Sequence, residues 1–146
     1  MPDPTAREIA DAPRILVIAP AGCGKTHLIA AAVEQCHRRQ LVLTHTHAGV
    51  RAILDHLKRR GVPKNKYSVR TIDGFALCYA SSFPIIAEWN NANPSGDDWK
   101  ELPRAYRRAL AREAIREVVS ATYSGVFIDE YQDCSESQHE MVLELA

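Results

Sequence analysis

The sequence lacks an excess of charge of either sign and has no long apolar run. Its 146 residues carry 18 lysines and arginines against 18 aspartates and glutamates, so no overall field draws the chain toward nucleic acid or an anionic membrane. No apolar run approaches the roughly 18 residues that suggest a membrane span. The first residues include Asp3 and no apolar stretch before Arg14, which is unlike a secretory signal. These absences predict an intracellular, cytoplasmic protein with no membrane segment.

Cysteines are few and widely separated. Cys23, Cys36, Cys78 and Cys134 form no CxxC pair, and a domain of this length buries enough apolar surface to fold without cross-links. Hydrophobic residues make up 46% of the chain and charged residues 25%, which excludes a disordered or collagen-like protein. We therefore expect a globular domain with reduced thiols and no zinc site.

Charge that cancels over the whole chain is segregated locally. Residues 51–70, called here the basic segment, contain one acidic residue, Asp55, and the following basic ones: Arg51, Lys58, Arg59, Arg60, Lys64, Lys66 and Arg70. From Asp129 onward the chain has acidic residues and no lysine or arginine. Such an acidic end either binds a cation or is simply solvated.

Short runs of strand-forming residues alternate with longer helical patterns. The expected strands are Ile15–Ile18, Leu41–Leu43, Tyr67–Val69 and Val126–Ile128. The expected helices are Lys25–Gln35, Val50–Leu57, Phe75–Tyr79, one from about Pro103 to about Ser120, and a last one from Glu136. A polar, turn-prone stretch covers residues 90–98. This alternation predicts an α/β fold with a parallel sheet that helices cover on both faces.

The segment between the first expected strand and the first expected helix has the composition of a phosphate-binding loop. It reads Ala19, Pro20, Ala21, Gly22, Cys23, Gly24, Lys25, Thr26, which fits the AxxGxGK[ST] variant of the P-loop. Gly22 and Gly24 let the backbone curl so that its N–H groups point at phosphate oxygens. Lys25 supplies a charge for the β- and γ-phosphates, and the Thr26 hydroxyl can ligate Mg2+. The alternative is a glycine turn with an incidental lysine.

A pair of carboxylates follows the last expected strand. Asp129 and Glu130 come directly after Val126–Ile128, at the carboxyl end of a strand, where open α/β sheets bind their ligands. Asp129 suits a magnesium shell, and Glu130 suits a general base that activates the attacking water. The alternative is an acidic turn before a helix, with Asp133 or Ser135 as its N-cap.

Taken together, these segments resemble the motifs of the UvrD/Rep-like superfamily 1 DNA helicases, in that family's order. The phosphate loop resembles motif I, residues 43–51 motif Ia, residues 70–76 motif Ib, and residues 127–134, with the core DEYQD, motif II. The similarity runs from Arg14 to about Gln138. It implies a RecA-like domain that binds ATP and Mg2+, in which Lys25 and Glu130 act in catalysis and Gln132 couples the γ-phosphate to the DNA site.

The resemblance also implies a path for single-stranded DNA. Its candidate contacts are Thr44, His45, Thr46 and His47 in motif Ia, and Thr71, Asp73 and Phe75 in motif Ib. Hydroxyls and backbone amides at strand ends can hold phosphates, and an aromatic ring can stack on a base. The alternative is that Phe75 belongs to the core and that the histidines are ordinary loop residues.

The sequence departs from the family in several places. Residues 1–18 contain no glutamine of the kind that reads adenine in this family, and Asp73 stands where the family often has histidine. We expect residues 1–146 to form one ATP-binding domain, 1A, with a reduced 1B-type insertion at about residues 84–102. The second RecA-like domain, which supplies the arginine fingers, is absent from the sequence. The chain should therefore be a fragment that needs that domain, in cis or in trans, for full activity.

Two other functions fit a phosphate loop. One is a small P-loop kinase, and the other is a stand-alone nucleotide-binding protein that regulates a partner without turnover. The DEYQD segment disfavours a kinase, because a phosphotransferase needs an acceptor pocket and lid arginines and has no use for a water-activating glutamate. The helicase motor domain is the function that the sequence predicts.

Overall fold

A computed structural model describes residues 4–18 and 22–145 of the chain. In chain order its elements are α1 (Ala6–Asp11), α2 (Lys25–Gln35), β1 (Gln40–Thr44), α3 (His47–Arg59), η1 (Lys64–Lys66), β2 (Tyr67–Thr71), α4 (Ile72–Ser82), α5 (Pro84–Ala87), α6 (Asp98–Leu110), α7 (Glu113–Thr122), β3 (Gly125–Ile128), η2 (Tyr131–Asp133) and α8 (Glu136–Leu143). Among these described residues, no helix is long and apolar enough to cross a membrane.

The strands form a parallel sheet of order β2-β1-β3, with β1 in the centre. Val42 lies opposite Val69 on one side and Phe127 on the other. Because all strands run in one direction, the residues that follow β1, β2 and β3 meet at one edge of the sheet. We call this the carboxyl edge.

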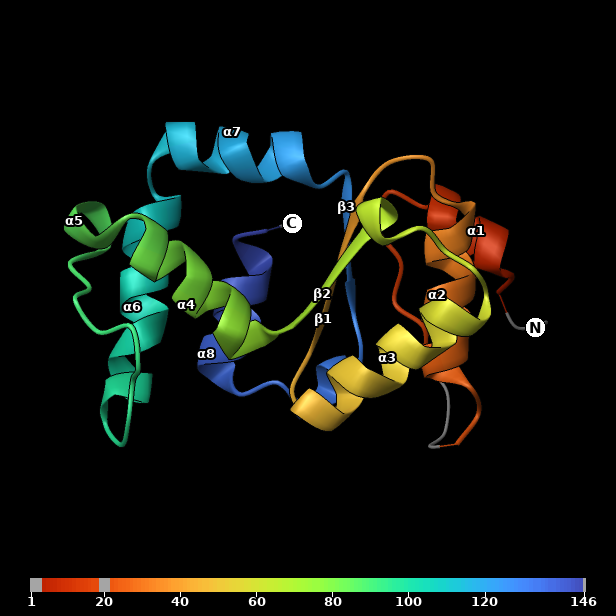
Figure 1. Cartoon of the computed structure of the whole chain (residues 1–146), viewed down its shortest axis with the longest axis horizontal. Helices are drawn as coiled ribbons and strands as arrows, with labels where there is room; N and C mark the ends of the chain where they lie inside the picture. Colours follow the sequence, from red (N-terminus) through yellow and green to blue (C-terminus); the bar gives the residue numbers. More distant parts are fainter. Residues whose placement is uncertain (1–3, 19–21, 146) are drawn as a thin grey trace.

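Helices cover both faces of the sheet, as the sequence predicts. Alternate residues of a strand point to opposite faces, so Val42 packs with α2 and α3, while Leu41 and Leu43 pack with α4, α6 and α8. Figure 1 shows α2 and α3 on one side of the strands and α4, α6 and α8 on the other. The expected α/β fold is therefore confirmed.

Side-chain caps begin the helices that follow the strands. Thr46 Oγ1 accepts a hydrogen bond from Gly49 N at 3.0 Å, and Thr71 Oγ1 accepts one from Gly74 N, also at 3.0 Å. Both bonds satisfy backbone donors that have no partner within the helix. The two caps fix the N-termini of α3 and α4 at the carboxyl edge.

The expected strand at Ile15–Ile18 is wrong. These residues form no strand, and Leu16 and Ile18 are 69% and 88% exposed. The β-branched side chains of Ile15, Val17 and Ile18 favour an extended backbone. A strand also needs a neighbouring edge with which to exchange hydrogen bonds. Among the described residues β3 pairs with β1 alone, so its other edge is open, but Ile15–Ile18 forms no strand beside it.

The expected single helix over residues 103–120 is also wrong, because two helices cover this region. The first helix ends at Leu110, with Ala111 as its C-cap. Arg112, the N-cap of the second helix, has an extended backbone (φ −87°, ψ 122°), and the guanidinium of Arg116 donates to the carbonyl of Leu110 at 2.8 Å. Pro103 lies inside α6 and not at its start. Proline has no backbone N–H, so Pro103 cannot donate a hydrogen bond to the carbonyl of Trp99, and α6 lacks that one backbone hydrogen bond.

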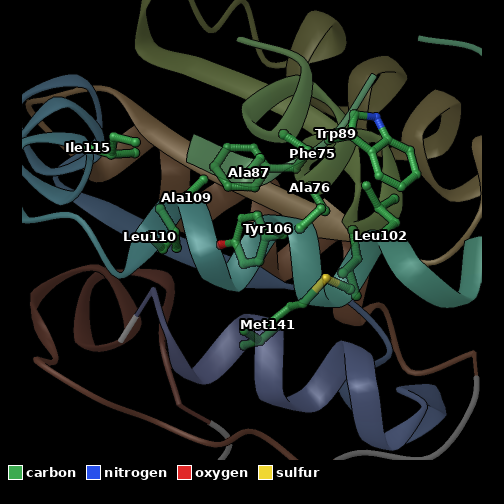
Figure 2. Close-up of a cluster of buried hydrophobic side chains, with 14 of the residues drawn as sticks. Phe75, Ala76, Ala87, Trp89, Leu102, Tyr106, Ala109, Leu110, Ile115 and Met141 are labelled. Atoms are coloured by element: carbon green, nitrogen blue, oxygen red, sulfur yellow. The ribbon is translucent and has the colours of Figure 1, made fainter. Parts of the chain in front are cut away.

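The larger core cluster lies between α4, α6 and α8 and centres on Tyr106. In Figure 2 the Tyr106 ring, carried by α6, lies between Phe75 and Met141. The Phe75 and Tyr106 rings pack edge to face with centroids 6.3 Å apart. Tyr106 is 1% exposed, and its hydroxyl has no hydrogen-bond partner among the described residues. The ring therefore stabilises the fold through packing, while the hydroxyl carries a desolvation cost.

Tyr106→Phe is expected to stabilise the chain by about 1–2 kcal/mol, because it removes a buried hydroxyl that has no partner and keeps the packed ring. Burial also raises the pKa of Tyr106 above its ordinary value of 10.0. As the pH rises above 10, the unfolded chain ionises first, so this residue lowers the stability progressively. Thermal unfolding at pH 7 and pH 11 should show the gain at both values, and a larger gain at pH 11. A lower melting temperature in the variant would contradict this account.

Candidate functional site

The carboxyl edge brings the predicted phosphate loop next to motif II. Lys25 and Thr26 begin α2, while Asp129 and Glu130 follow β3. Gly22 and Gly24 have φ values of +81° and +77°, a left-handed conformation that glycine adopts without the cost a side chain brings. The glycines therefore form the tight turn that the sequence predicts. Ala19, Pro20 and Ala21 lie outside the described residues.

Two contacts join these segments, which are more than a hundred positions apart in the chain. The Thr26 hydroxyl donates to Asp129 Oδ2 at 3.1 Å. The Lys25 ammonium lies 3.3 Å from Glu130 Oε2. A threonine hydroxyl beside an aspartate is the pair that holds Mg2+ in P-loop NTPases, and the lysine is the residue that reaches the β- and γ-phosphates.

Asp129 has an oxygen available for a cation. The residue is 4% exposed, and its Oδ1 has no hydrogen-bond partner among the described residues. Burial raises the pKa of this carboxyl, while the hydrogen bond from Thr26 opposes that rise. The described part of the chain contains no group of three His, Cys, Asp or Glu side chains that could hold a metal. Mg2+ commonly takes one or two protein ligands together with phosphate oxygens and water, so Thr26 and Asp129 fit that ion.

Asp129→Asn is expected to raise the melting temperature of the nucleotide-free chain by about 2–4 °C, because a neutral amide costs less to bury than a carboxylate with an unpaired oxygen. The same change should remove the extra stability that Mg2+ adds in the presence of nucleotide, since the charged ligand is lost. Thermal unfolding with ADP, with and without Mg2+, measures both effects. Destabilisation of the nucleotide-free chain, or an unchanged response to Mg2+, would contradict the role of Asp129.

Glu130 is held as an ionised carboxylate. The hydrogen bond from the Gln132 amide is the main cause that lowers the pKa of Glu130, and Lys25 and His45 lower it further. Its backbone is left-handed, with φ +54°, which is uncommon for a residue with a side chain and is often found at functional sites. An ionised glutamate beside Lys25 has the charge state that a general base requires.

The candidate residues of motif Ia run from the last residue of β1, through the turn, to the first residue of α3. Thr44 is 3% exposed, Thr46 caps α3, and His47 is exposed on the first turn of that helix. His45 turns inward, and its Nε2 lies 3.1 Å from the carbonyl oxygen of Glu130. The backbone amides at the N-terminus of α3 and the His47 side chain are thus the groups of this motif that face solvent.

The motif Ib residues surround the start of α4. Thr71 caps this helix, and both Asp73 carboxylate oxygens accept from Gln138 Nε2 at 3.2 Å. Phe75 is 2% exposed within the core, so its ring offers no face to a nucleic-acid base. The sequence contains no signal for the Gln138 contact, because that residue lies 65 positions away on α8.

The basic segment spreads over two opposite edges of the sheet. Because α3 leads from the carboxyl end of β1 back to the start of β2, its last turn and the residues after it lie at the amino edge. This places Lys58, Arg59, Arg60, Lys64 and Lys66 away from the candidate site, and Arg60 is paired there with Glu34 at 2.8 Å. Arg51 and Arg70 remain near the carboxyl edge. Local attraction of a polyanion to that edge therefore depends on few positive charges.

A hollow of about 200 Å3 lies elsewhere, between β2, α4 and α7. Its lining includes Arg70, Phe75, Tyr79 and Tyr123, and none of the described residues of the phosphate loop or motif II. It is therefore separate from the candidate site.

Comparisons with known proteins identify the family. A family model described as an AAA domain, AAA_19, matches residues 4–146. No curated protein and no solved structure shows a significant match. The family match covers nearly the whole chain, and the parallel sheet, the glycine turn and the Lys25–Glu130 and Thr26–Asp129 contacts agree with a nucleotide-binding P-loop fold. The chain therefore belongs to the AAA_19 family of AAA domains.

Proposed function

We propose that this chain is the ATP-binding motor domain of a UvrD-like DNA helicase, which couples Mg-ATP hydrolysis to movement along single-stranded DNA. The observation that carries the proposal is the meeting of Lys25 and Thr26 with Asp129 and Glu130 at one edge of the sheet. This arrangement combines a phosphate-binding loop with a carboxylate that can hold Mg2+ and a second that can activate water.

In the nucleotide-free chain Lys25 is paired with Glu130. Triphosphate oxygens carry more charge than one carboxylate, so Lys25 turns to them when ATP binds and leaves Glu130 free to accept a proton from the attacking water. Thr26 and Asp129 would hold Mg2+, which would supply positive charge to neutralise the phosphates. Gln132, which donates to Glu130, then keeps the carboxylate ionised and directed toward the site.

A second domain belongs to this proposal. Among the described residues, the ion pair that motif II makes is the one between Glu130 and Lys25. Phosphoryl transfer also needs arginines that neutralise charge in the transition state. We assign these arginines to a second RecA-like domain, in the same polypeptide or in another one.

Single-stranded DNA is assigned to the carboxyl edge, along the N-termini of α3 and α4. Exposed backbone amides at a helix N-terminus bind phosphate, and the helix dipole adds to this attraction. The groups available there are the first turns of both helices with their Thr46 and Thr71 caps, the His47 side chain and the charge of Arg51. Stacking on Phe75 forms no part of the proposal, because that ring is buried.

Arg51→Ala is expected to weaken binding of an oligo-dT and to lower the salt dependence of that binding by about 0.7 in slope, the share of one phosphate contact to a single strand. Arg59→Ala is the matched control, because Arg59 is exposed on the same helix but at the amino edge. Fluorescence anisotropy at several salt concentrations measures both variants. Equal losses in the two variants would indicate diffuse attraction and would contradict a path along the carboxyl edge.

A further inference from the structure

His45 connects the candidate nucleic-acid segment to the candidate base. It lies between Thr44, the last residue of β1, and Thr46, the N-cap of α3. The residue is half-buried, and its Nε2 lies 3.1 Å from the carbonyl oxygen of Glu130. Because a carbonyl oxygen only accepts, Nε2 carries the proton and donates it to this bond.

The Glu130 carbonyl receives a second hydrogen bond. Asp133 N donates to it at 2.9 Å and closes the short η2 turn. A carbonyl oxygen has two lone pairs, and here both have partners on opposite sides. These two bonds fix the orientation of the peptide group that follows the Glu130 Cα.

The backbone of Glu130 needs such support. Its φ of +54° and ψ of 44° lie in the left-handed region, which a residue with a Cβ holds only where its surroundings determine the conformation. Asp129 N is fixed by a bond of 2.8 Å to the Leu43 carbonyl, so the chain is held before Glu130 by β1 and after it by His45. The direction of the Glu130 side chain therefore depends on the His45 contact.

Cys134 completes the surroundings of the His45 ring. Its sulfur lies 3.6 Å from the same Nε2, and the residue is partly buried. Since Nε2 carries the proton that it donates to Glu130, the sulfur can act there only as a weak acceptor.

We propose that His45 is a positioning residue that aims the Glu130 carboxylate, and that nucleic acid bound beside Thr46 and His47 controls ATP hydrolysis through it. This inference rests on the proposed function. A ligand that shifts the first turn of α3 must move His45, which is joined to the Thr46 cap by one peptide bond, and His45 in turn moves the Glu130 main chain. Coupling between binding sites is reciprocal, so the factor by which single-stranded DNA changes the affinity for nucleotide equals the factor by which nucleotide changes the affinity for single-stranded DNA.

Two substitutions separate this role from base stacking. His45→Gln keeps an N–H donor near the position of Nε2 but removes the ring, whereas His45→Phe keeps a ring and removes the donor. A positioning role predicts that the glutamine variant retains function and the phenylalanine variant loses it. A stacking role predicts the opposite order, with its effect on DNA affinity.

The experiment compares both variants with the wild-type chain in three measurements: affinity for Mg-ADP, the rate of ATP hydrolysis at saturating nucleotide, and affinity for an oligo-dT with and without Mg-ADP. For His45→Phe we expect a nearly unchanged affinity for Mg-ADP, a hydrolysis rate lower by roughly 10- to 100-fold, and loss of the effect of nucleotide on oligo-dT affinity. His45→Gln should recover most of the rate and of the coupling. Wild-type hydrolysis and coupling in His45→Phe would overturn the proposal.

Hydrogen exchange provides a measurement that does not depend on activity. The amide of Asp133 is bonded to the Glu130 carbonyl, so loss of the His45 bond should speed exchange in the peptide that covers residues 130–134, and His45→Gln should restore the slow exchange. Equal exchange in all three chains would overturn the proposal. If the wild-type chain binds no nucleotide, the proposed function fails, while exchange still decides whether His45 holds Glu130.

Discussion

Lys25→Ala is expected to reduce the affinity of the chain for ATP by roughly 100-fold, because a charged hydrogen bond to phosphate contributes about 1.5–3 kcal/mol. In the nucleotide-free chain the Lys25 ammonium lies 3.3 Å from Glu130 Oε2, and in the proposed complex with ATP it contacts the phosphates. Titration with a fluorescent ATP analogue measures the effect.

Lys58→Ala is the matched control for this variant. Lys58 is exposed on α3 and lies at the amino edge, so its loss changes the net charge equally without touching the site. Its affinity for ATP should equal that of the wild-type chain. If Lys25→Ala binds ATP as tightly as this control does, the phosphate-loop assignment is incorrect.

Glu130→Gln is expected to keep nucleotide binding and to slow hydrolysis by roughly 10²- to 10⁴-fold, the usual contribution of a general base. The amide cannot accept the proton of water, but it retains the shape of the side chain. Binding should be equal or slightly tighter, because Lys25 loses the carboxylate that competes with phosphate for it. Single-turnover hydrolysis with the chain in excess over ATP separates the chemical step from binding.

The control for the glutamate variant is Glu136→Gln, which removes an exposed carboxylate from the first turn of α8. Its hydrolysis rate should stay at the wild-type value. Hydrolysis by Glu130→Gln at that same rate would exclude Glu130 as the base.

The sequence predicts the α/β fold and the main contacts of the site because both depend on local patterns. Apolar strands followed by helices determine the parallel sheet. The glycines at positions 22 and 24 predict a tight turn, and both have a left-handed backbone in the structure. Residues that follow parallel strands lie at the same edge of the sheet. This is why Lys25 and Glu130, far apart in the chain, could be assigned to one site.

Other features depend on contacts that no local pattern encodes. Ile15–Ile18 has the composition of a strand, but composition alone does not decide whether a segment pairs with the open edge of β3. The division of residues 98–122 into two helices depends on the extended backbone of Arg112 and on the Arg116 side chain that caps the first helix. The inward turn of His45 likewise depends on the left-handed Glu130, 85 positions away.

The assignment of residues 1–146 to one 1A domain, and of residues 84–102 to a reduced insertion, remains a prediction. In the structure the latter range contains α5, a loop and the first turns of α6. The loop is fixed by Asp98, whose carboxylate accepts from Asn91 at 2.7 Å and from Ser95 N at 3.0 Å. The region is thus an ordered part of this chain.

If this chain is the motor domain that we propose, it hydrolyses ATP under the control of single-stranded DNA. The most direct measurement is the Mg2+-dependent rate of ATP hydrolysis with and without an oligo-dT, for the chain alone and for the chain mixed with or extended by a second RecA-like domain. We expect slow hydrolysis by the chain alone and a faster rate, stimulated by the oligonucleotide, when the second domain is present. Rapid hydrolysis by the chain alone that the oligonucleotide does not change would contradict it and would indicate a self-contained ATPase or kinase.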